Sequence, residues 1–112
     1  MTTCSRQRCK HRASEEGLCK THLKQRKDRA FSLRIRARDG KCLSCGTTVN
    51  LQCAHIVSRR YLATRWNEDN AITLCRADHK KFTEWPLIWE AWLGENFPGR
   101  LERMKNLARG LD

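Results

Sequence analysis

The chain has 112 residues, of which 39% are hydrophobic and 31% charged, and a formal net charge of +11 at pH 7. A chain of this length forms one small domain, with an appendage at most, and is too short for a large hydrophobic core. Its mean hydropathy is −0.75, and no run approaches the roughly 18 apolar residues of a membrane span. We expect no signal peptide, because the N-terminus lacks an apolar run, and therefore a cytoplasmic protein with no membrane partner.

The positive charge is concentrated in the first third of the chain. Residues 1–41 hold 13 Lys/Arg and 4 Asp/Glu, a balance of +9, whereas residues 42–112 hold 10 and 8, a balance of +2. A strongly basic segment favours a polyanionic partner, and nucleic acid is the common one. The alternative is a basic surface that serves solubility alone.

Residues 1–24 carry the pattern Cys4-x4-Cys9 followed by Cys19-x2-His22. Seven cysteines is an odd number, and nothing indicates export, so metal is favoured over a disulfide framework. Two pairs of sulfur and nitrogen donors suit a closed tetrahedral zinc site, which would fold a segment too short to fold alone. His11 is a weaker substitute ligand, and the alternative is a disordered tail of reduced thiols.

Residues 25–39 are predicted to form a basic connector helix that ends before Gly40, because they contain neither Gly nor Pro. Its cations would contact DNA phosphates without reading sequence; they are Arg26, Lys27, Arg29, Arg34, Arg36 and Arg38. The alternative is a solvated helix face.

Residues 40–84 combine a second cysteine cluster with a strand pattern. Val49, Leu51 and Cys53 alternate as in a short strand that ends at His55, and residues 71–74 predict a second strand, followed by a helix that carries His79. Cys42, Cys45 and Cys75 suggest a second structural zinc. Asp78 is our first choice for its fourth ligand, and Cys53 our second, because Cys53 is expected in the core.

The spacing of His55, Asn70 and His79 behind a Cys-x-x-Cys turn resembles that of the HNH endonucleases, the ββα-metal nucleases, over roughly residues 38–84. The N-terminal pattern is similar to small zinc knuckles that precede nuclease domains in some phage proteins. The resemblance implies a small α+β protein: a knuckle (1–24) and basic helix (25–39), a ββα-metal module (40–84) with structural zinc, and C-terminal helices (85–112) packed on the module. A phage-encoded protein would act in the host cytoplasm.

The resemblance also implies roles for these residues. His55 would be the general base, Asn70 would brace the loop between the strands, and His79 would bind a catalytic Mg²⁺, Mn²⁺ or Ni²⁺. This chain departs from the family pattern twice. Asp78 stands where the family has a fourth cysteine, and Ala54 stands where many members have an acidic metal ligand. We therefore expect weak affinity for the catalytic metal in the absence of DNA.

Further cations lie beside these positions and could clamp the phosphates that flank the cut: Arg59, Arg60, Arg65, Lys80 and Lys81. Tyr61, Leu62 and Trp66 are expected to form the core of the loop between the strands, with base stacking as the alternative.

The C-terminal third predicts two helices. Trp85, Ile88, Trp89, Trp92 and Leu93 share one helical face that Gly94 should end, and a second helix over about 100–109 places Leu101, Met104 and Ala108 on one side. We expect the tryptophans to enlarge the core, with DNA stacking or partner docking as alternatives.

Together these features predict a metal-dependent endonuclease that hydrolyses phosphodiesters of double-stranded DNA. One active site per chain favours nicking, by a monomer or weak dimer. Two alternatives stay open. One is a zinc-dependent nucleic-acid-binding protein that does not cleave, and the other is an accessory nuclease of phage packaging or recombination that needs a partner protein.

Overall fold

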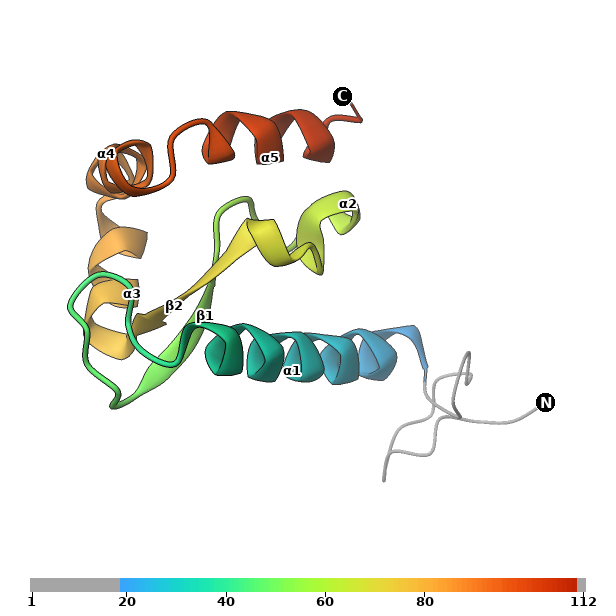
Figure 1. Cartoon of the computed structure of the whole chain (residues 1–112). Helices are drawn as coiled ribbons and strands as arrows, with labels where there is room; N and C mark the ends of the chain where they lie inside the picture. Colours follow the sequence, from blue (N-terminus) through green and yellow to red (C-terminus); the bar gives the residue numbers. More distant parts are fainter. Residues whose placement is uncertain (1–18, 111–112) are drawn as a thin grey trace. The chain divides into compact units, whose positions relative to one another are not determined.

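A computed structural model describes residues 19–110 of the chain. They form an α+β fold with a two-stranded antiparallel sheet (Figure 1), which confirms the predicted class. The strands are β1 (Leu51–His55) and β2 (Ala71–Cys75). The helices are α1 (Lys20–Asp39), α2 (Leu62–Arg65), the 3-10 helix η2 (Glu68–Asn70), α3 (Arg76–Glu84), α4 (Pro86–Asn96) and α5 (Arg100–Ala108). None of these helices is both long and apolar enough to cross a membrane.

The chain divides into two compact units, residues 1–31 and 32–112. Of the first unit, the structure describes residues 19–31, which lead into and form the first part of α1. α1 begins at Lys20, earlier than the predicted connector, and it takes in His22. It ends before Gly40 as predicted, because Gly40 adopts a φ of 71°, a left-handed conformation that closes a helix and that glycine adopts without steric cost.

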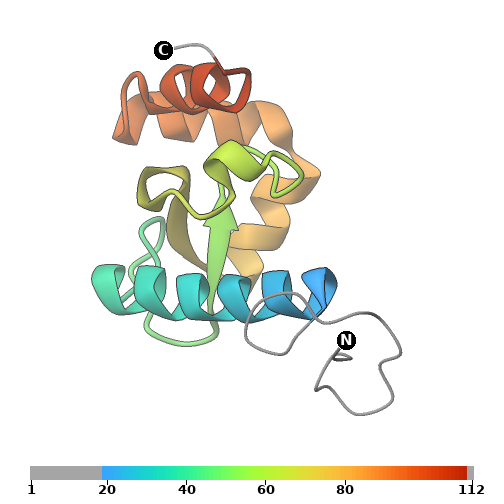
Figure 2. The ribbon, with the colours of Figure 1, turned by 90° about the vertical axis from the view of Figure 1, so that its right-hand side faces the viewer.

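In the second unit, the strands form a hairpin whose five paired positions run from Leu51 opposite Cys75 to His55 opposite Ala71. Every residue of β2 is buried, because the sheet is covered on both faces (Figure 2). On one face Ile72 and Leu74 pack with Phe82 of α3. On the other face the Thr73 hydroxyl donates to the Ile35 carbonyl, 3.2 Å away, in the second half of α1. Val49, which we expected in the first strand, lies before β1 and is exposed.

The outer edge of β2 is closed by the end of α1 and the turn that follows it. The Thr73 N–H donates to Asp39 Oδ2 at 2.8 Å, and the Thr73 carbonyl accepts from the Leu43 N–H at 3.0 Å. Burial acts to raise the pKa of Asp39, but the hydrogen bonds from Arg38 and Thr73 outweigh it and lower the pKa below 3.8. The edge is therefore held by an ionised carboxylate at neutral pH.

The C-terminal helices enlarge the core, as predicted, but with fewer residues than expected. Trp89 and Trp92 stack with ring centroids 5.8 Å apart and pack on the same cluster as Phe82, while Leu93 and Met104 are fully buried. Trp85 and Ile88 were expected on this buried face and are instead 60% and 49% exposed. α4 also runs through Gly94 to Asn96, since a glycine is tolerated inside a packed helix and Pro98 only follows later.

The loop between the strands has a different core from the one predicted. Tyr61 and Leu62 are 42% and 54% exposed, and Trp66 is half-buried. The buried side chains of this loop are those of Thr64 and Asn70. Polar side chains fill this space because they bond to the backbone of the loop.

Candidate metal centre and histidine cavity

Cys42 and Cys45 are presented by a tight turn between α1 and β1. The Gly46 N–H donates to the Cys42 carbonyl at 2.9 Å, and Gly46 adopts a φ of 83° that favours glycine. The Cys45 N–H points back to Cys42 Sγ at 3.4 Å. A backbone donor aimed at sulfur stabilises a thiolate, which is the form that binds metals.

Cys75 and Asp78 reach the same place from the start of α3. Cys75 is the N-cap residue of this helix, and its sulfur accepts a hydrogen bond from the Asp78 N–H. Asp78 lies in the first turn. Anionic ligands at a helix N-terminus are stabilised by the unpaired N–H groups and by the helix dipole.

The four ligand atoms of Cys42, Cys45, Cys75 and Asp78 all lie within 4.8 Å of one another. Cys45 Sγ and Cys75 Sγ are 3.7 Å apart, and Cys42 Sγ is 3.4 Å from Asp78 Oδ2. A tetrahedral zinc site with Zn–S distances of about 2.3 Å has S···S edges of about 3.8 Å and S···O edges of about 3.5 Å. The cluster could therefore bind a metal such as zinc.

The acidic groups of this cluster shift one another's pKa values, because they lie close together. A hydrogen bond from the Thr47 backbone acts to lower the pKa of Cys45, but burial and the neighbouring Cys42, Asp78 and Cys75 raise it to about 11. Burial acts to raise the pKa of Asp78, yet hydrogen bonds with the three cysteines lower it. Binding of a cation here must displace thiol protons, so affinity should increase with pH.

Cys53 and four residues near the N-terminus were also predicted as metal ligands. Cys53, our second choice for the cluster, lies on β1 outside it, and burial raises the pKa of its thiol to about 11. Cys4 and Cys9 lie outside the described residues. Cys19 precedes α1, His22 lies in its first turn, and Cys19 Sγ is 3.4 Å from His22 Nδ1.

His55 and His79 line one cavity of about 440 Å³, together with residues such as Ser58 and Thr83. His55 is the last residue of β1, and His79 lies in the second turn of α3. The pairing of β1 with β2 and the position of α3 directly after β2 bring the two imidazoles to this cavity, although 24 positions separate them in the chain.

Each imidazole is oriented by a hydrogen bond to an oxygen. His55 Nε2 lies 2.9 Å from the Arg65 carbonyl oxygen, which can only accept, so the neutral ring carries its lone pair on Nδ1. His79 Nδ1 lies 2.8 Å from Gln52 Oε1, which leaves the lone pair on Nε2. Burial lowers the pKa of His79 below 6.5, and the neutral form is the one that binds metals.

Asn70 holds the loop that carries the Arg65 carbonyl. Its fully buried side chain accepts from the Val57 N–H at 2.8 Å and donates to the carbonyls of Val57 and Thr64, each at 3.0 Å. These bonds span the loop between the two strands. Its role in catalysis stays a prediction.

The predicted DNA-contacting cations differ in their surroundings. Arg38 is bonded within the protein: it donates to both carboxylate oxygens of Asp39 and to the carbonyls of Glu68 and Ala71. Arg65 donates to the Arg59 carbonyl, and Arg34 lies 3.7 Å from a carboxylate oxygen of Glu68. The cations with exposed side chains include Arg26, Lys27, Arg29, Arg59, Arg60, Lys80 and Lys81.

Sequence reasoning missed two groups at the cavity. Gln52 was not singled out, although its position three residues before His55 places it on the α3 side of the sheet with Ala54. The Arg65 carbonyl carries no signal in the sequence. Ala54 is 2% exposed and offers no ligand, and among the described residues the Cys42 cluster is the one group of three or more metal-binding side chains.

Comparisons of the chain with protein-family models, with curated proteins and with solved structures found no match.

Proposed function

We propose that this protein is a metal-dependent DNA endonuclease of the HNH type, with His55 as general base and His79 as ligand of a catalytic divalent cation. The observation that carries the proposal is the cavity shared by these two histidines, each of which is oriented by a hydrogen bond to an oxygen. The basic charge of the chain supports a DNA substrate.

In this proposal the protein activates and orients a water molecule. His55 Nδ1 takes a proton from the water that attacks the phosphorus, and the Arg65 carbonyl stabilises the resulting imidazolium through the Nε2–H bond. A divalent cation at the phosphate would neutralise charge that develops on the phosphate oxygens. The exposed Arg59 and Lys80 supply cations for neighbouring phosphates.

The donor set around His79 fits a weakly held hard cation. His79 Nε2 is the one protein ligand that we assign to it, because Ala54 replaces a carboxylate and Gln52 is already bonded to His79. Mg²⁺ and Mn²⁺ keep several waters and take phosphate oxygens as ligands, so DNA itself would complete the site. The cysteine cluster, in contrast, fits zinc in a structural role and positions the helix that carries His79.

Cleavage of supercoiled plasmid tests the proposal, with Mg²⁺, Mn²⁺ or Ni²⁺ compared against EDTA. We expect metal-dependent formation of open circles. His55→Ala should lower the rate by a factor on the order of 10² to 10⁴, the usual contribution of a general base. His79→Ala should raise the metal concentration required, and Asn106→Ala, at an exposed position of α5, is the matched control.

A second candidate is a nucleic-acid-binding protein that does not cleave, which Ala54 at the cavity favours. Under this alternative the wild type binds DNA but gives no open circles with any of the three metals. That result would remove the nuclease proposal and leave the zinc cluster and basic surface as a binding module.

A further inference from the structure

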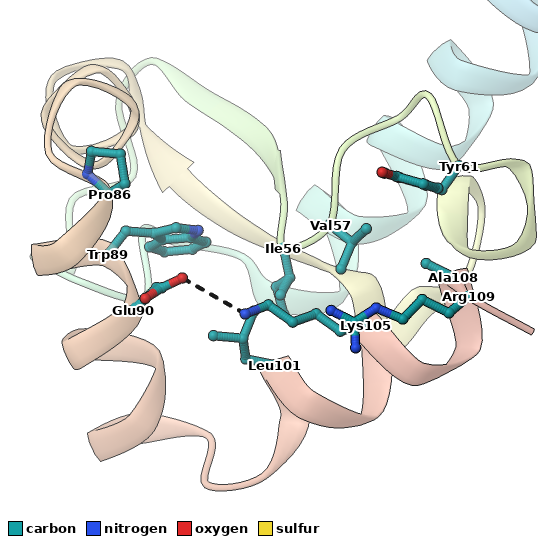
Figure 3. A pocket seen from close by; sticks show the side chains of 10 residues that line it. All are labelled: Ile56, Val57, Tyr61, Pro86, Trp89, Glu90, Leu101, Lys105, Ala108 and Arg109. Atoms are coloured by element: carbon teal, nitrogen blue, oxygen red, sulfur yellow. Dashed lines mark ion pairs between the residues drawn. The ribbon is translucent and has the colours of Figure 1, made fainter. Parts of the chain in front are cut away.

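The structure has a second pocket, of about 300 Å³, whose lining side chains are shown in Figure 3. It is formed by α4, α5 and the loop that follows β1, all of them in the second unit. Ile56, Pro86 and Trp89 line both this pocket and the histidine cavity. The two spaces are therefore neighbours that share a wall.

The lining of the pocket suits a flat, polar-edged ring. Trp89 and Tyr61 stand on opposite sides (Figure 3), and aliphatic side chains such as Val57 and Leu101 also line the pocket. Aromatic and aliphatic walls of this kind hold nucleobases by stacking, whichever base is offered. The volume is at the lower end of the range of small-ligand pockets, which suits one base rather than a larger ligand.

Charged groups on the α4 and α5 side add hydrogen-bonding capacity. Lys105 Nζ lies 3.8 Å from Glu90 Oε1, and Arg109 is the C-cap residue of the helix that carries Lys105. A carboxylate can accept from a base amino group, while the cations can donate to base oxygens or to a flanking phosphate.

We propose that this pocket receives an unpaired nucleobase next to the phosphate that is bound in the histidine cavity. This inference rests on the proposed nuclease function and specifies its substrate: DNA with an unstacked nucleotide, as in a bulge, flap or junction. A base inside a regular duplex cannot reach a concave pocket without leaving the stack, which costs free energy that an already unpaired base does not require.

The test compares the binding of the protein to two DNA duplexes. EDTA is present and no divalent metal is added, so that no cleavage occurs. One carries a single-nucleotide 2-aminopurine bulge, and the other carries 2-aminopurine in a base pair. We expect the bulged DNA to bind tighter by a factor on the order of ten, the contribution of about one stacked base. The 2-aminopurine emission should change on binding only for the bulged DNA.

Ala108→Leu is designed to fill the pocket, and Tyr61→Ala removes one exposed wall. Each should abolish the preference for the bulge while affinity for the paired duplex is kept. Asn106→Leu places the same leucine on an exposed position of the same helix and should retain the preference. If leucine at position 108 disturbs the fold, the Tyr61→Ala variant still tests the proposal.

Equal binding of both duplexes by the wild type would overturn the pocket proposal, as would a bulge preference that survives both variants. Plasmid cleavage that remains metal-dependent and His55-dependent would show that the nuclease proposal stands in either case. No binding of either DNA would overturn both proposals together.

Discussion

At the scale of single residues, buried polar groups define the geometry of the candidate site. Asn70 has no exposed surface and makes three hydrogen bonds to the backbone at Val57 and Thr64. The loop held in this way delivers the Arg65 carbonyl to His55. A buried amide whose bonds are all satisfied specifies one loop conformation, because each alternative leaves a donor or acceptor without a partner.

Asn70→Ala should therefore destabilise the protein by on the order of 3 kcal/mol, since it leaves several buried backbone groups without partners. Urea unfolding measures this difference. Asn96→Ala is the control, because Asn96 donates one bond to the Trp92 carbonyl at an exposed position and should cost less than about 1 kcal/mol. Similar losses in the two variants would argue against a bracing role for Asn70.

Arg38 shows how a residue-level prediction can depend on tertiary structure. A basic helix predicts phosphate contacts for each of its arginines, and the sequence does not distinguish one from another. In the fold, Arg38 lies in the last turn of α1 and donates hydrogen bonds to Asp39 and to the Ala71 carbonyl of β2. We therefore expect Arg38 to contribute more to the packing of α1 on the sheet than to DNA.

At the scale of elements, α3 connects the two parts of the site. Cys75 caps the N-terminus of α3 and Asp78 lies in its first turn, and both belong to the metal cluster. His79 directly follows Asp78 in the same helix. A metal bound at the cluster would fix the first turn of α3 and, with it, the direction of the His79 ring. Zinc would thus act on the cavity through the helix and without contact with substrate.

Asp78→Cys should increase affinity for metal at this cluster by at least about tenfold, because thiolate is a softer ligand than carboxylate. Titration with Co²⁺ measures it, since each thiolate adds to the ligand-to-metal charge-transfer absorption. Cys75→Ser should weaken the site, and Cys53→Ser, outside the cluster, should leave it unchanged. A loss of Co²⁺ affinity in the Asp78→Cys variant would contradict the assignment of position 78 as a ligand.

The elements themselves were predictable where the pattern is local. The end of α1 at Gly40, β2 and the helix that carries His79 follow from glycine, a β-branched run and the spacing after Cys75. The exposure of Trp85 and Ile88 was not predictable, because periodicity identifies an apolar face but not how much of it a small sheet can cover. The contact of Gln52 with His79 was also missed, since strand register decides which side chain faces the helix.

At the scale of the whole molecule, most of the net positive charge and the two histidines of the cavity lie in different parts of the chain. Residues 1–41 carry +9 of the net +11, whereas both histidines lie in the nearly balanced remainder. We expect nonspecific affinity to come from the basic segment through release of counterions, and the site of cleavage to be chosen at the cavity and the neighbouring pocket.

The salt dependence of DNA affinity measures the contribution of nonspecific phosphate contacts. Arg29→Gln and Lys80→Gln, at exposed positions of α1 and α3, should each reduce the slope of log Kobs against log salt by about 0.9, the value for one phosphate contact. Arg103→Gln on α5 is the matched control, because Arg103 already pairs with Asp69 at 3.0 Å, and its slope should equal that of the wild type. If Arg103→Gln lowers the slope as much as Arg29→Gln does, the cations act as a diffuse field and α1 is not the surface that contacts DNA.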